Sequence, residues 1–303
     1  MPTLITPNTV GLREDLNTLD LMGDKHTIMF NVAKKGVATN PHHEWLEDAM
    51  APGNKNNAAV QGSAFNFSTT DTKLRMGNWT QIISNLAGIS RSVIQSHLAN
   101  GGNYAVTSAL TYEKEKAMRQ NAIDTDAAML TGTAQVPTST VPGKMGGMIQ
   151  LTNSAHQYTN ATTGTLTWDD IDKGLNLMYT AGADPDTAIV TPDMKATVIK
   201  LNDEAPFKTV VVQNQAGNSE SRKGVNGYGS FFAGSNAQVE IYSDPRQAAN
   251  TITMFEKDKT SLEVLGNANI ENSIQFDGIG LAIITECCLK LRHSKAAAVL
   301  TMA

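Results

Sequence analysis

One cluster of side chains has the composition of a metal site. Imidazole and carboxylate groups crowd into one short segment, and these are ligands that zinc and other divalent metals take from proteins. The segment carries His42, His43, Glu44, Glu47 and Asp48. Its spacing fails the His-Glu-x-x-His pattern of zinc hydrolases, because Glu44 is followed by Trp-Leu-Glu and not by a second histidine. We interpret the cluster as a polar surface segment; the alternative is a soluble α/β metal-dependent hydrolase using His42, His43 and Asp48.

Other motifs of known chemistry are incomplete. Lys144 follows Gly143, but Thr138 occupies the position where a phosphate-binding loop has its first glycine. In the segment from Gly227 to Gly234, the third glycine comes too late for a dinucleotide-binding fingerprint. The nucleophile elbow Gly-x-Ser-x-Gly does not occur. The sequence therefore predicts no catalytic residue, no cofactor and no enzyme.

Composition describes a globular chain of one large or two ordinary domains, with 303 residues, of which 41% are hydrophobic and 17% charged. The net charge of −5 gives no electrostatic sign of nucleic-acid binding, for which a basic face would be expected. Cys287 and Cys288 are the only cysteines, and we expect both to be reduced, because neighbours in a strand point to opposite faces. The N-terminus shows no secretory signal, and the apolar stretch from Gly278 is too short and too charged to span a membrane.

The elements that position these residues are organised around one long helix, predicted for residues 103–130. This stretch contains no proline or glycine and is rich in good helix formers, and Gly132 follows where a helix commonly ends. The apolar stripe that we expect to face the core consists of Ala105, Ala109, Tyr112, Ile123, Ala127 and Leu130.

The middle of this helix is charged. Glu113 stands three residues before Lys116, and Glu115 stands four residues before Arg119, so each pair can meet on the helix surface. Two interpretations stay open: a solvated face, or a face that contacts a neighbouring subunit. A helix with so narrow an apolar stripe needs a sheet or a partner to lie on.

Before the helix, residues 1–36 are polar and mixed, and a loop rich in Asn, Ala, Ser and Gly extends to residue 72. Strands are predicted from Leu74 to Val93. After the helix, a capping box of Thr167 and Asp170 opens a second helix, and a strand at residues 187–190 leads to a third helix capped by Thr191. Further strands are predicted at residues 208–213, 238–244, 252–258, 261–266 and 279–291.

The order of these parts resembles the major capsid proteins of tailed bacteriophages of the Hong Kong 97 type, above all a subfamily seen in some short-tailed phages. The resemblance extends from Leu16 to Val299 and is carried by HHEWLEDAM, MGNWTQI, the long helix, GKMGGMIQL, AGADPDTAIVTPDMK and ECCLKLRHSKAA, in that order.

The resemblance implies an α+β fold with an N-terminal arm (1–36), an extended E-loop hairpin (37–92), a P-domain holding the spine helix on a β-sheet (93–165), an α/β A-domain (166–250) and a P-domain sheet with the C-terminus (251–303). It implies a subunit that self-assembles into hexamers and pentamers, forming an icosahedral shell around phage DNA. Expected partners are a portal, a separate scaffolding protein, a cement protein, and double-stranded DNA enclosed without sequence-specific binding. The expected location is the virion, after synthesis in the host bacterial cytoplasm.

In such a shell, the loop that precedes residue 72 has an expected role in assembly. Residues 54–71 contain too few apolar side chains to order the loop on its own chain, so we expect it to lie across a neighbouring subunit. The residues expected to make assembly contacts are Val60, Phe65 and Phe67 of the loop and Glu113, Glu115, Lys116 and Arg119 of the helix. A shell of the same fold, the encapsulin-like nanocompartment, is the alternative function.

Overall fold

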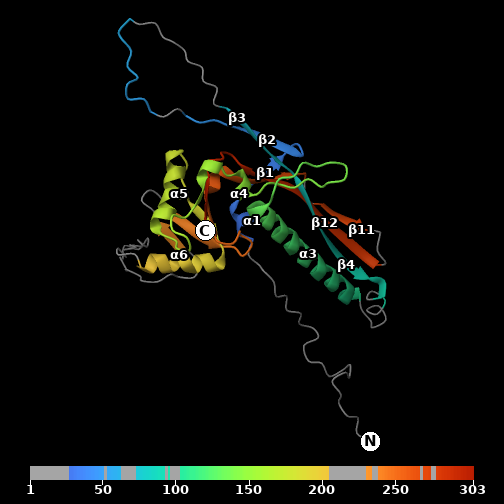
Figure 1. Cartoon of the computed structure of the whole chain (residues 1–303). Coiled ribbons are helices and arrows are strands. Elements are labelled where there is room, and N and C mark those ends of the chain that lie inside the picture. Colours follow the sequence, from blue (N-terminus) through green and yellow to red (C-terminus); the bar gives the residue numbers. More distant parts are fainter. Residues whose placement is uncertain are drawn as a thin grey trace, which may run out of the picture.

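Two β-sheets and one long helix organise the computed structural model (Figure 1). It describes residues 27–50, 53–62, 73–92, 95, 103–204, 230–233, 238–266, 269–273 and 278–303. The helices are α1 (Ile28–Val32), α3 (Asn103–Thr131), α4 (Met148–Leu151), α5 (Trp168–Thr180) and α6 (Pro192–Glu204), with short 3-10 turns η1 (Ser154–His156) and η2 (Lys257–Lys259). None of the described helices combines the length and apolarity needed to cross a membrane.

The first sheet is built on one long strand. β12 (Gly278–Leu291) pairs antiparallel with β4 (Gln81–Ser90), β10 (Thr260–Leu265) and β11 (Asn269–Ser273). β1 (Lys34–Ala38) joins β10 in parallel. A separate antiparallel hairpin consists of β2 (His42–Glu47) and β3 (Leu74–Trp79) and projects away from both sheets (Figure 1).

The second sheet has six strands in the order β5-β13-β9-β6-β8-β7. Its strands are β5 (Gln157–Thr159), β13 (Ala297–Thr301), β9 (Thr251–Phe255), β6 (Thr187–Val190), β8 (Gln238–Ser243) and β7 (Ser230–Ala233). The predicted α/β unit is confirmed here: α5 starts at the capping box of Thr167 and Asp170, and Thr191 Oγ1 accepts a hydrogen bond from the Met194 amide at the start of α6. The strand predicted at 208–213 lies outside the described residues.

The long helix is present as α3, but among the stripe residues whose burial is described only Leu130 is fully buried, and Tyr112, Ile123 and Ala127 are half-buried. Ile123 is only half-buried, whereas the residues that turn inward are Ala117, Asn121, Thr125, Asp126, Met129 and Leu130. Asn121 donates from Nδ2 to the Ile83 carbonyl and to Asn85 Oδ1, both at 3.1 Å. Small and hydrogen-bonded polar side chains therefore seat α3 on β4 and β12, which a search for apolar residues misses.

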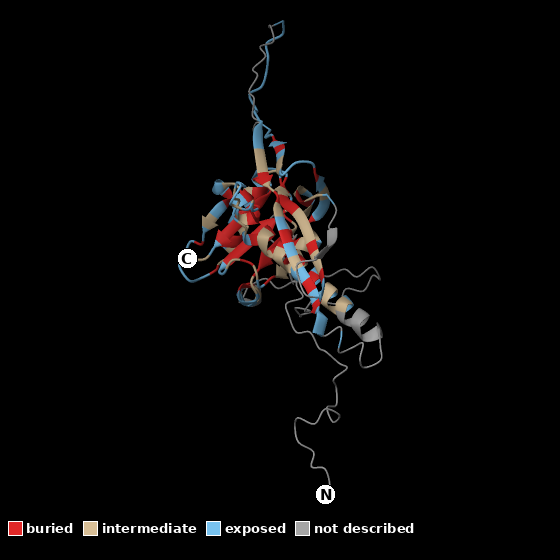
Figure 2. Ribbon diagram, turned by 90° about the vertical axis from the view of Figure 1, so that its right-hand side faces the viewer, coloured by how far each residue is buried: buried red, intermediate tan, exposed pale blue. Residues whose placement is uncertain are grey.

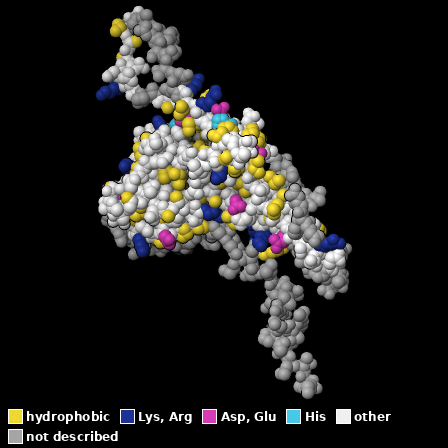
Figure 3. Space-filling view, turned by 45° about the vertical axis from the view of Figure 1, so that its right-hand side comes forward, with side chains coloured by type: hydrophobic (Ala, Val, Ile, Leu, Met, Phe, Trp, Pro, Cys, Tyr) yellow, Lys and Arg dark blue, Asp and Glu magenta, His cyan; other side chains and the backbone are white. Residues whose placement is uncertain are grey.

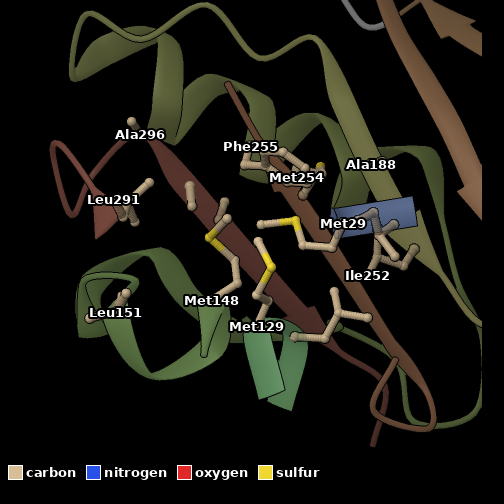
Figure 4. Close-up of a cluster of buried hydrophobic side chains, with 14 of the residues drawn as sticks. Met29, Met129, Met148, Leu151, Ala188, Ile252, Met254, Phe255, Leu291 and Ala296 are labelled. Atoms are coloured by element: carbon tan, nitrogen blue, oxygen red, sulfur yellow. The ribbon is translucent and has the colours of Figure 1, made fainter. Parts of the chain in front are cut away.

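The core lies where the second sheet, α1, α4 and the end of α3 meet. Met29, Met129, Met148 and Met254 come from four different elements and are fully buried (Figure 4). Unbranched methionine fills such irregular gaps well. Burial is concentrated in this central part, while the projecting hairpin is largely exposed (Figure 2).

Residues 28–38 of the expected arm and loop are packed on the body. Met29 of α1 is fully buried, and β1 continues through residue 38 in the first sheet. The domain boundaries given above stay predictions.

The two cysteines are free and fully buried, as expected for reduced thiols on opposite faces of β12. Burial raises the pKa of each thiol to about 12, so both stay protonated at neutral pH.

Candidate assembly surfaces

The structure places His42 Nδ1 3.7 Å from Glu44 Oε1 but does not gather the other histidine and carboxylates of this segment with them. His42 stacks on Trp79 with ring centroids 4.3 Å apart, while His43, the next residue of the strand, lies 5.9 Å from the Trp45 ring. Glu47 is buried and Asp48 is exposed. Within the described residues, no group of three or more His, Cys, Asp or Glu side chains could hold a metal ion. The described residues therefore do not support the metal site on which the hydrolase alternative rests.

Buried polar side chains anchor the base of the β2–β3 hairpin instead. Asn78 Nδ2 donates to the carbonyls of Gly146 (3.0 Å) and Leu289 (2.7 Å), and Asn78 Oδ1 accepts from the Gly146 amide at 2.7 Å. Glu47 accepts from the Ser294 amide at 2.7 Å and from Ser294 Oγ at 3.0 Å. These bonds tie the hairpin to β12, to the segment before α4 and to the turn before β13, so its direction is fixed where it leaves the body.

Changing Asn78 to Ala should destabilise the subunit by about 3 kcal/mol, because the substitution leaves buried backbone groups of Gly146 and Leu289 without partners. Denaturant unfolding of the free subunit measures this change. The control is Asn57→Ala in the exposed loop, which should shift the free energy of unfolding by less than about 0.5 kcal/mol. Similar unfolding midpoints for the two variants would show that the Asn78 bonds do not hold the hairpin.

Beyond this base the hairpin exposes four apolar side chains, which we call the hairpin surface: Leu46, Met50, Val60 and Leu74. They do not form one continuous area, because the strand register places Leu46 and Leu74 on opposite faces of the hairpin. Met50 is 99% exposed and Val60 is 81% exposed. Val60 is thus placed as expected for an assembly contact, whereas Phe65 and Phe67 lie outside the described residues. Hydrophobic side chains appear near Lys, Arg and His residues where the hairpin leaves the body (Figure 3).

A second apolar area lies on the face of β4 and β12 that points away from α3. We call it the sheet surface: Ile82, Leu86, Ala282 and Ile284. Ile82 is 64% exposed and Leu86 is 76% exposed, and Leu86 is the register partner of Ala282 on β12. Sequence reasoning missed this surface, although β4 carries large apolar residues at both even and odd positions. Such a pattern indicates that both faces of a strand are to be covered.

The charged middle of α3 is largely exposed. Lys116 Nζ lies 4.0 Å from Glu113 Oε2, so the predicted meeting of these two residues is observed. Glu115 and Arg119 are both exposed. A surface ion pair of this kind adds little stability, and its role in assembly stays a prediction.

Comparisons with known proteins find similarity over nearly the whole chain. A family model described as SU10 major capsid protein matches residues 6–303. No curated protein matches the chain.

Among solved structures, the capsid of a native GTA particle is similar with a TM-score of 0.64 at 12% identity, covering 97% of this chain and 96% of that one. The cyanophage A-1(L) capsid gives a TM-score of 0.64 at 11% identity, with coverages of 97% and 98%. The holo-SrpI encapsulin complex from Synechococcus elongatus gives 0.57 at 11% identity, with coverages of 99% and 96%. The α+β fold of the Hong Kong 97 type is confirmed by these similarities.

Proposed function

The chain belongs to the SU10 major capsid protein family and is a shell-forming capsid subunit of a bacteriophage virion, and we propose that it builds its shell from hexamers and pentamers that close into an icosahedral head. We further propose that the shell encloses double-stranded DNA and that the subunit is made in the host cytoplasm.

One observation supports the proposed mode of assembly: the hairpin is fixed at its base and exposes four large apolar side chains beyond it. Leu46, Met50, Val60 and Leu74 are more than half exposed in the described part of the chain. A second subunit can cover them, and in a closed ring every subunit both gives and receives one hairpin. Each large apolar side chain that is fully removed from water contributes about 1.5 to 3 kcal/mol, so a modest contact becomes large when it is repeated around a ring.

The sheet surface supplies a second area that association would bury. Two uncovered apolar areas on one chain, on the hairpin and on β4, suit a subunit with more than one neighbour.

The proposed relation to DNA is containment without sequence-specific binding. A chain with a net charge of −5 does not offer the excess of cations that would hold DNA phosphates tightly and with a steep salt dependence. We also propose a portal, a separate scaffolding protein and a cement protein as further partners, and no catalytic step for this chain.

An encapsulin-like nanocompartment is the second candidate, because the holo-SrpI encapsulin shares the fold. Negative-stain microscopy of the expressed protein, with an assay for nuclease-protected DNA in particles from infected cells, separates the candidates. We expect capsomers or closed shells from the purified protein and protected DNA in the infection particles. Shells that hold protein cargo and no protected DNA would favour the nanocompartment, and a small oligomer under all conditions would contradict both.

A further inference from the structure

A buried group of charges lies outside both assembly surfaces. Arg246 Nε lies 3.2 Å from Asp126 Oδ2 and 3.2 Å from Asp244 Oδ1. The side chains of both aspartates are fully buried, and that of Arg246 is 13% exposed. Two carboxylates thus share one closely placed guanidinium away from water, an arrangement in which both cannot be ionised without cost.

The cluster connects three separate parts of the fold. Asp126 lies on α3, which packs on the first sheet, and its Oδ1 accepts a hydrogen bond of 2.8 Å from the Phe30 amide of α1. Asp244 directly follows β8 of the second sheet, and its amide donates to the Val190 carbonyl of β6 at 2.8 Å. The Arg246 amide in turn donates to Asp244 Oδ1 at 3.0 Å. The charges therefore bridge the first sheet, by way of α3, to the second.

Lys35 and Cys287 are further titratable groups near the cluster. Lys35 lies close enough to sense Asp126, but its amino group donates to the Phe30 carbonyl and lies 3.5 Å from the Phe30 ring centroid. Burial lowers the pKa of Lys35. The Cys287 thiol, close to Lys35 on β12, is neutral because burial raises its pKa to about 12.

These contacts favour one proton held between the two carboxyl groups. Burial raises the pKa of Asp126 to about 7, and a hydrogen bond to Asp244 and the charge of Asp244 act in the same direction. The Phe30 amide and Arg246 oppose this rise without cancelling it.

We propose that Asp126, Asp244 and Arg246 form a proton-operated joint between the two sheets, firm when one proton is shared by the carboxyl groups and weaker when both are charged. The joint gives a shell subunit a built-in response to pH near neutrality, at the contact that links the first sheet, by way of α3, to the second. Loss of the proton leaves two adjacent carboxylates with one guanidinium, so their mutual repulsion pushes α3 and the end of β8 apart.

The direction of the effect on stability follows from the raised pKa. The folded subunit holds the proton more tightly than the unfolded chain, so the stabilisation is complete below the ordinary aspartate pKa of 3.8 and is lost as pH rises through about 7. The buried His156 works the other way, because burial lowers its pKa and the folded state disfavours its charged form. A fall in stability from acid to neutral pH is therefore not explained by His156.

Thermal melting of the intact free subunit, measured from about pH 5.5 to pH 8.5, tests the joint. We expect the Tm of the wild type to fall by several degrees over this range. Asp126→Asn should lose most of this fall and melt higher than the wild type at pH 8.5, because the amide still accepts from Phe30 and can donate to Asp244. Asp244→Asn, which removes the other carboxylate, should flatten the profile in the same way and provides a second variant if the first folds poorly.

Asp124→Asn is the matched control, since Asp124 lies on the same helix but bonds Asn85 and Gln120 away from the cluster. It should keep the wild-type slope. The proposal is overturned if the wild type shows no fall in Tm, or if both Asp126→Asn and Asp244→Asn retain the wild-type slope. Because the test uses the free subunit, its failure leaves the proposed shell function untouched.

Discussion

Replacing residues 54–71 by a short Gly-Ser turn is expected to leave a folded subunit that no longer closes stable shells. The described residues of this loop, 54–62, are all exposed, and the strand pair β2–β3 that carries the loop is anchored by Asn78 and Glu47. The fold should therefore not depend on the loop. Assembly should, because ordering such a loop costs about 1 to 2 kcal/mol per residue and only a neighbouring subunit can offset that cost.

Circular dichroism should show unchanged helix content in this variant, and electron microscopy should show loss of shells. Two single substitutions refine the result: Val60→Ser should weaken assembly, whereas Asn57→Ala in the same exposed loop should not. Hydrogen exchange should find the loop unprotected in free subunits and protected in particles. Equal protection in both states would mean that the loop packs on its own chain.

Local signals in the sequence predicted local structure well. The capping box of Thr167 and Asp170 and the Thr191-Pro192 start of α6 involve residues within one helical turn, so their geometry follows from neighbouring residues. The long helix was found because good helix formers run from Asn103 to Thr131 without interruption. Apolar spacing predicts the buried position of Leu130 but not those of Asn121 and Thr125, because these two polar side chains are buried through hydrogen bonds to β4 and to the helix itself.

Pairings between distant residues could not be predicted in the same way. β1 lies beside β10 with Gly36 opposite Glu263, and no local pattern specifies that partner. The structural role of Glu47 at the end of β2 also depends on a distant residue. Glu47 looked like a candidate metal ligand, but its partner is Ser294, which lies almost at the other end of the chain. The exposed apolar side chains of the hairpin and of β4 are proposed to contact other subunits, and such contacts cannot be predicted from local patterns in one chain.

Changing Leu86 to Asp should give a soluble, folded subunit that fails to assemble. Leu86 is 76% exposed on the face of β4 that points away from α3, so the charge meets water in the free subunit and should alter its stability by less than about 0.5 kcal/mol. In a shell that covers the sheet surface, the same charge would be buried without a partner at a cost of several kcal/mol per contact.

A position three residues earlier on β4 provides the contrast for Leu86→Asp. Ile83 lies on the same strand but is 6% exposed and faces α3, where its carbonyl accepts from Asn121. Ile83→Asp should therefore reduce the melting temperature of the free subunit strongly, whereas Leu86→Asp should leave it nearly unchanged. Analytical ultracentrifugation and electron microscopy then report assembly. If Leu86→Asp forms shells as efficiently as the wild type, the sheet surface faces solvent in the particle, and the hairpin surface must supply the apolar contacts that hold neighbouring subunits together.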